Sequence, residues 1–199
     1  MDDETTFSQG EGEEFSGALD PHRRASMLRA LEATFETYGE VAPSVALVGW
    51  KAATLVGDIY DDASHVIIIE DRERLVESIE KGLMSLDLGK KVRLVTGAPD
   101  EVRIDDKVDI GVVDVTSTWF IEGDEADILE HVQNRVVAPG GDLIPRRLSH
   151  LFELTSAPTS AAGMPLRIPR FSRPGEPVAV LSESKHFITR EVAAGETLP

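Results

Sequence analysis

The sequence contains no cysteine among its 199 residues. This absence excludes disulfides, zinc fingers, thiolate nucleophiles and clusters held by cysteine ligands. Long apolar runs are also missing, since no stretch reaches the roughly 18 residues of a membrane helix. The chain opens with Met1-Asp2-Asp3-Glu4 and not with a basic or apolar signal segment. We therefore expect a cytoplasmic protein with no membrane segment.

Positive charge is scarce. The chain has 20 basic and 36 acidic residues, which gives a net charge of −16 and an isoelectric point near 4.6. A chain this acidic is a poor partner for nucleic acid or for an anionic lipid surface. Lysine is especially rare, and two explanations stay open: a surface adapted to high salt, or an ordinary acidic protein with an acidic tail.

Composition divides the chain into three parts. Residues 1–19 are acidic and rich in Gly, Ser and Thr, which predicts a flexible N-terminal tail. Residues 20–155 carry the apolar patterning of one domain that is long enough to build a core. Residues 156–199 are interrupted by proline and predict a short β extension, in which strand-like segments at 178–181 and 187–192 suit a hairpin.

The middle part alternates strand-like and helical segments. Val and Ile fill both faces of the run from His65 to Glu70, which is typical of a strand covered on both sides in a parallel sheet. Because parallel neighbours need long crossover connections, the alternation predicts an α/β fold with a doubly wound, mostly parallel sheet and flanking helices. The predicted strands are 44–49, 65–70, 91–96, 108–113 and, after a turn at Pro139-Gly140-Gly141, 142–144; the predicted helices are 21–38, 51–60, 71–86 and 124–137.

Candidate site residues follow from this fold class. Ligands of an open parallel sheet bind beyond the carboxyl ends of its strands, near the point where the strand order reverses. The residues that end the predicted strands are therefore the candidates: Gly49, Glu70, Gly97 with Ala98, and Asp114.

Each main candidate has a second explanation. Glu70 lies 21 residues after Gly49 and can accept two hydrogen bonds from a ribose diol, or it can cap the helix that follows. Gly49 permits close approach of a ligand to the backbone, or only a strand-to-helix turn. Asp114 can orient a cationic substrate or act as a base, or it can cap the next turn. The five histidines show no metal-ligand spacing, so no metal is expected.

The segments 45–70, 91–101 and 108–147 resemble the S-adenosylmethionine-binding domain of class I methyltransferases, and most closely that of the protein arginine methyltransferases. The strongest stretch begins at Val108-Asp109-Ile110 and reaches, after a loop and a helix, Val136-Val137-Ala138-Pro139-Gly140-Gly141-Asp142-Leu143-Ile144-Pro145. The family carries "VDI" and "LAP-G-LIP" at these places. The resemblance implies a Rossmann-like fold, S-adenosylmethionine as cofactor and methyl transfer to an acceptor.

The resemblance implies cofactor-binding roles for several residues, and the sequence departs from the family's pattern at some of these positions. Glu70 matches the ribose-binding acid of the family. The first motif of the family is an acid followed by G-x-G-x-G, and here Leu47 replaces the acid while Gly49 keeps the first glycine. Lys51 replaces a glycine at which the family's backbone approaches the methionine part of the cofactor, so its side chain is expected to intrude.

On the acceptor side, the family's substrate loop holds two glutamates that clamp a guanidinium. Asp114 matches the first and is shorter by one methylene, while the second falls at Gly123 with Glu122 beside it. The resemblance therefore implies catalytic roles for Asp114 and Glu122, and cofactor contacts for Gly97 and Ala98. The chain after residue 144 is too short for the large β-barrel that the arginine enzymes carry.

Three functions from different classes stay open. The first is a divergent S-adenosylmethionine-dependent methyltransferase that acts on an unidentified protein or small molecule. The second is a catalytically inactive member of the same fold that works by binding a partner, including a second copy of itself in a homodimer. The third is a nucleotide-binding protein of Rossmann type, although its G-x-G-x-x-G signature is absent.

Overall fold

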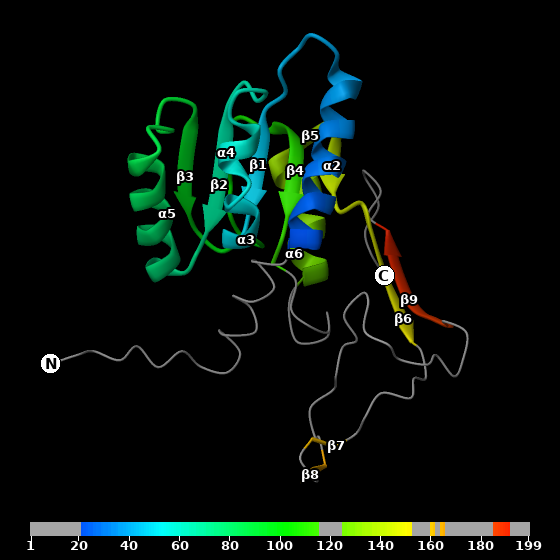
Figure 1. The fold of residues 1–199 in the computed structure, drawn as a ribbon. Coiled ribbons are helices and arrows are strands. Elements are labelled where there is room, and N and C mark those ends of the chain that lie inside the picture. Colours follow the sequence, from blue (N-terminus) through cyan, green and yellow to red (C-terminus); the bar gives the residue numbers. More distant parts are fainter. Residues whose placement is uncertain (1–20, 116–124, 153–159, 162–163, 166–184, 192–199) are drawn as a thin grey trace, which may run out of the picture. The chain divides into compact units, whose positions relative to one another are not determined.

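The computed structural model describes residues 21–115, 125–152, 160–161, 164–165 and 185–191 (Figure 1). The described residues fall into two compact units, which divide at Arg147: the first precedes it, and the second runs from Arg147 to Glu191. The predicted tail at 1–19 and the predicted boundary after residue 155 fall outside the described residues and stay predictions.

The first unit is built on a five-stranded sheet in which every pairing is parallel, in the order β3-β2-β1-β4-β5 (Figure 1). This confirms the predicted fold class. The chain winds outward from β1 to β3 and then returns to the other side of β1 with β4, so the strand order reverses between β1 and β4. The strands are β1 (Val45–Val48), β2 (Val66–Glu70), β3 (Val92–Thr96), β4 (Val108–Val113) and β5 (Val137–Ile144).

The two faces of the sheet are covered by different helices. Ile110 and Val112 of β4 belong to a core cluster with Leu31 of α2 (Pro21–Tyr38) and with buried residues of α3 (Trp50–Ala53) and α4 (Val56–Ile59). Gly111 between them faces the other way, because a Cβ there would lie 3.2 Å from Val132 at the start of η1. Burial on both faces explains the apolar runs of β1 and β2, strands that are buried at every position.

Two predicted helices differ in detail from the structure. The segment predicted as one helix at 51–60 forms the two short helices α3 and α4, and Thr54 between them turns its hydroxyl back to the carbonyl of Lys51 at 2.7 Å. The helix predicted at 124–137 is α6 (Glu125–His131) followed by the π-helical η1 (Val132–Val136). The helix α2 has its predicted bounds, and α5 (Glu73–Ser85) lies within its predicted range. Among these described helices, none is long and apolar enough to cross a membrane.

Strand β5 begins earlier than predicted. Pro139-Gly140-Gly141 was expected to turn the chain before a strand at 142–144, but the strand starts at Val137 and includes these residues as an irregularity. The pairing with β4 steps from Val108–Val137 to Ile110–Asp142, so β5 carries the extra residues.

The second unit contains β6 (Arg147–Phe152), which pairs antiparallel with β9 (Lys185–Glu191), and a two-stranded pair of β7 (Ser160–Ala161) with β8 (Met164–Pro165). The strand predicted at 187–192 overlaps β9, whereas β6 was not predicted. The strand predicted at 178–181 lies outside the described residues.

The substitution Gly141→Ala tests the close pairing of β4 with β5. An added Cβ would lie 2.5 Å from the backbone oxygen of Asp109. The strands must then separate, and we expect a loss of about 1–3 kcal/mol in the free energy of unfolding, measured in urea.

Gly82→Ala is the matched control, because Gly82 lies inside α5 and nothing lies within 4 Å of an added Cβ. Alanine favours a helix over glycine, so this variant should gain about 0.5–1 kcal/mol. Equal effects of the two variants would contradict the close pairing of β4 with β5 at Gly141.

Candidate functional site

The carboxyl ends of the three central strands bring the main candidates to one edge of the sheet. The amide nitrogen of Gly49 donates to the carbonyl of Ile69, directly before Glu70, at 2.9 Å. The amide of Asp114 donates to the carbonyl of Val48, directly before Gly49, at 3.0 Å. Glu70, Gly49 and Asp114 therefore end neighbouring strands, with Gly49 in the middle at the reversal of strand order.

Gly49 is required by the chain itself. Its φ of 87° lies in the region that favours glycine. A Cβ would also lie 2.9 Å from the backbone oxygen of Asp114 and 2.9 Å from a methyl group of Val115. The close approach that this glycine permits is therefore made by the start of the loop after β4, and it accounts for Gly49 without a ligand.

Glu70 is buried, with a side chain only 2% exposed, and its carboxylate receives four hydrogen bonds. The amide of Trp50 donates to Oε2 at 2.7 Å, and the amide of Arg72 donates to Oε1 at 3.1 Å. The guanidinium of Arg72 supplies the other two, from Nε to Oε1 at 2.9 Å and from Nη2 to Oε2 at 3.3 Å. Glu70 also shares a hydrogen bond with the side chain of Asp71, so its acceptor positions are fully used.

The pKa values of Glu70 and of the neighbouring Asp71 are shifted in opposite directions. Burial alone raises the pKa of Glu70, but the hydrogen bonds and the charge of Arg72 outweigh burial and lower this pKa below its ordinary value. Desolvation, together with the hydrogen bond and the charge of Glu70, raises the pKa of Asp71. The hydrogen bond that the two groups share therefore favours the ionised form of Glu70 over that of Asp71.

Asp114 is also engaged by an arginine. Arg23 of α2 donates from Nε to Oδ2 at 3.1 Å and from Nη2 to Oδ1, which is a two-pronged contact of a guanidinium with a carboxylate. The side chain of Asp114 is 6% exposed and that of Arg23 is 32% exposed. The carboxylate that was predicted to orient a cationic substrate thus holds a cation from the chain's own N-terminal helix.

The remaining predicted residues are placed as follows. Lys51 lies in α3 and is only 5% exposed. Gly97 follows β3 and donates its amide to the carbonyl of Glu70 at 3.2 Å, so it lies beside the carboxyl end of β2. The carbonyl of Ala98 accepts the amides of Glu101 and Val102, so Ala98 begins a turn directly after Gly97. Glu122 lies outside the described residues.

Arg23 and Arg72 are the site residues that the sequence did not indicate. Arg72 stands two residues after Glu70, so a contact within the same strand-to-helix turn was open to prediction from spacing alone. Arg23 is 91 residues away from Asp114, and only the packing of α2 on the sheet brings the two together.

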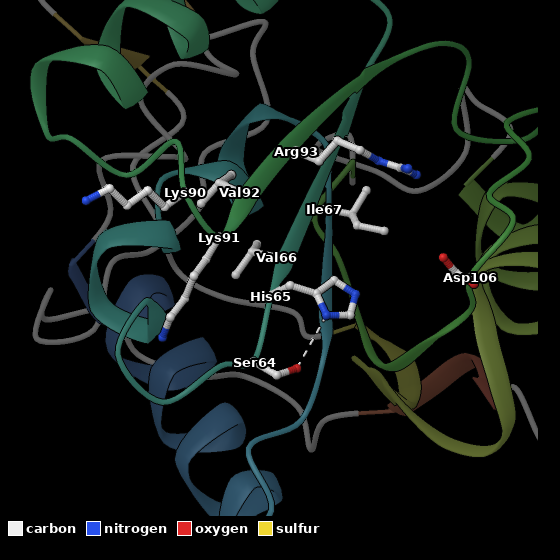
Figure 2. A pocket seen from close by; sticks show the side chains of 9 residues that line it. All are labelled: Ser64, His65, Val66, Ile67, Lys90, Lys91, Val92, Arg93 and Asp106. Atoms are coloured by element: carbon white, nitrogen blue, oxygen red, sulfur yellow. Dashed lines mark hydrogen bonds between the residues drawn. The ribbon is translucent and has the colours of Figure 1, made fainter.

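A separate cavity of 270 Å³ lies at the opposite, amino end of β2 and β3 (Figure 2). Its cationic side chains do not converge on one point. Lys91 donates to the carbonyls of Tyr60 and Ala63, and Lys90 points away from Arg93 in Figure 2. Within the described part of the chain no group of side chains is arranged to hold a metal ion. The carboxyl edge therefore remains the candidate site.

Glu70→Gln tests the charge balance at this edge. Because folding lowers the pKa of Glu70, its carboxylate stabilises the native state above the ordinary value of 4.5, and this contribution is lost as the pH falls through the lower folded pKa. We expect the variant to lose about 2 kcal/mol at pH 7, and the difference from wild type to shrink below pH 4.5. Urea unfolding at pH 7, 5, 4 and 3, at constant salt, measures this; a difference that stays constant would contradict it.

A double-mutant cycle of Arg23→Ala with Asp114→Ala tests the anchoring of α2. The pair is mostly buried and two-pronged, so we expect a coupling free energy of about 1–3 kcal/mol. The control cycle uses Arg24 with Asp58, an ion pair between side chains that are 36% and 37% exposed, for which coupling of about 0.5 kcal/mol or less is expected. Equal coupling in the two cycles would show that Arg23 adds no specific anchor.

Comparisons with known proteins place the fold. No family model and no curated protein matches the sequence. The chain is similar to a chain of the PRMT1 enzyme–prozyme heterotetrameric complex with AdoHcy from Trypanosoma brucei, with a TM-score of 0.68 and 14% identity, over 86% of this chain and 59% of that one. It is also similar to protein arginine methyltransferase 10 of Arabidopsis thaliana, with a TM-score of 0.50 and 16% identity, over 69% of this chain and 41% of that one.

The chain thus spans less than two thirds of the length of either of these proteins. The likeness to the first of them covers most of this chain, whose own sheet is all-parallel with helices on its two faces. The first unit therefore has the Rossmann-like fold of S-adenosylmethionine-dependent methyltransferases.

Proposed function

We propose that the chain is a methyltransferase-like protein that binds S-adenosylmethionine at the carboxyl edge of its sheet. The observation that carries this proposal is the place of Glu70. It ends β2 beside Gly49, at the reversal of strand order in a sheet ordered β3-β2-β1-β4-β5, where an acid is suited to a ribose diol. The neighbour from Trypanosoma brucei, which is described in complex with AdoHcy, supports this choice of ligand.

The residues present fit the ribose part of the cofactor best. Glu70 would hold the diol, and Gly97 with Ala98 would border the nucleoside beyond β3. Lys51 is buried in the turn where the resembled family has glycine, so this chain would have to accommodate the methionine part differently. When bound, S-adenosylmethionine supplies a methyl group activated on a sulfonium.

Asp114 is proposed to face the methyl acceptor, with Glu122 as a second carboxylate further along the sequence. Asp114 already holds a guanidinium, that of Arg23, so its oxygens are placed to receive a planar cation. An acceptor nitrogen held there would gain the methyl group as its bond to the sulfonium breaks, which leaves S-adenosylhomocysteine. The nitrogen would give up one proton, for which the carboxylate that orients it can be the acceptor. The acceptor, a protein or a small molecule, would have to take the place of Arg23.

The alternative is a catalytically inactive member of the fold that acts by binding a partner protein or a second copy of itself. The engagement of both edge carboxylates by arginines of the same chain favours it, as does the buried Lys51. Such a protein keeps the fold and its surface, while the charges at the carboxyl edge serve stability alone.

Calorimetric titration with S-adenosylhomocysteine tests the proposal. We expect saturable binding to the wild type and at least tenfold weaker binding to Glu70→Gln, because the diol loses a charged acceptor. Glu77→Gln is the matched control, since it makes the same change on the exposed surface of α5. Absence of heat at millimolar ligand would contradict the proposal.

Transfer of labelled methyl from S-adenosylmethionine to candidate acceptors then separates the two functions. Transfer that is lost in Asp114→Asn supports the enzyme. Cofactor binding without transfer, with a stable dimer or a co-purifying subunit seen by light scattering, supports the inactive binding protein.

A further inference from the structure

The guanidinium of Arg72 contacts Glu70 in a pattern that a ribose diol also has. One nitrogen of Arg72 donates to Oε1 at 2.9 Å and another donates to Oε2 at 3.3 Å. Two adjacent hydroxyl groups, each donating to a different oxygen of one carboxylate, make the same two bonds. Arg72 therefore fills the two acceptor positions that the nucleoside needs.

The other two donors to Glu70 come from the backbone. The amide of Trp50 donates to Oε2 and the amide of Arg72 donates to Oε1. These bonds do not depend on the Arg72 side chain. If that side chain leaves, Glu70 keeps its two backbone donors and the hydrogen bond that it shares with the Asp71 side chain. The two positions that Arg72 held, one on each oxygen, then become vacant for a vicinal diol.

The Arg72 side chain is exposed enough to move into solvent. It is 44% exposed, in contrast to the 2% of Glu70, and it precedes the first residue of α5. Its guanidinium can move into water, where it is well solvated, while Glu70 stays buried. The exchange thus replaces a cationic partner of the carboxylate by a neutral one that makes the same number of hydrogen bonds.

We propose that Arg72 is a gate on the nucleoside site: its guanidinium occupies Glu70 in place of the ribose diol, and the diol displaces it on binding. This inference rests on the proposed function, since it presumes a ligand with a ribose. Arg72 then sets the affinity for the nucleoside, and its side chain alone accounts for any weak binding by the wild type.

The test measures S-adenosylhomocysteine affinity of the full chain by calorimetry. Arg72→Ala should bind about tenfold more tightly than wild type, because the ligand no longer competes with two charged hydrogen bonds. Arg72→Lys should fall between them, because an ammonium keeps the charge but lacks the two-pronged geometry. Lys81→Ala is the matched control: it removes one positive charge from an exposed position of α5 and should bind as wild type does.

A second readout isolates the diol. Adenosine and 2′,3′-dideoxyadenosine are both uncharged, so a change of net charge at the site affects them alike. Arg72→Ala should improve the binding of adenosine and leave that of the dideoxy compound unchanged. Circular dichroism and thermal unfolding check that each variant is folded. If Arg72→Ala does not fold, Arg72→Lys is compared with the wild type instead.

Two outcomes would overturn the gate, and they differ in what they leave standing. If both arginine variants bind more weakly than the wild type, Arg72 positions Glu70, and the proposed function survives. No binding by the wild type or by either folded variant would overturn the proposed function, and the gate with it. An equal gain for adenosine and for the dideoxy compound would reduce the effect to charge and also overturn the gate.

Discussion

A buried carboxylate needs a partner, and this requirement shapes the carboxyl edge of the sheet. Covering the sheet on both faces places Glu70 and Asp114 where their side chains are only 2% and 6% exposed. An unpartnered ion at such depth is strongly unfavourable. Arg72 and Arg23 meet the requirement from the start of α5 and from α2. The contacts that attach these helices to the sheet are therefore the same contacts that control what the edge can bind.

Both partners are arginines, in a chain that is strongly acidic. A guanidinium offers several donors in a rigid plane, so it can meet both oxygens of a carboxylate at once, whereas lysine offers a point charge. The same geometry makes arginine a close competitor for any ligand that contacts both oxygens. The excess of acidic residues does not change this competition between arginine and ligand. Screening by salt acts more on exposed charges than on the close contact of a guanidinium with a buried carboxylate.

The sheet could be predicted from the sequence because burial on both faces leaves unbroken runs of Val and Ile, as in β2. Local deviations were harder, since they depend on single contacts. The hydroxyl of Thr54 divides the helix predicted at 51–60, and the irregularity of β5 depends on its pairing with β4. The shared edge of Gly49, Glu70 and Asp114 follows from the sheet, whereas the Arg23 contact depends on how a distant helix packs.

The presence of an acid at the end of β2 is weaker evidence for activity than it first suggests. Once the sheet buries Glu70, Arg72 makes it a stable part of the fold whether or not a nucleoside ever binds there. What separates an open site from a permanently filled one is the relative free energy of two partners for one carboxylate, and not the carboxylate itself. Arg72 is 44% exposed and can return to water, while the backbone amides keep their bonds. The fold thus leaves the exchange available, and the ligand has only to bind Glu70 better than a half-exposed guanidinium does.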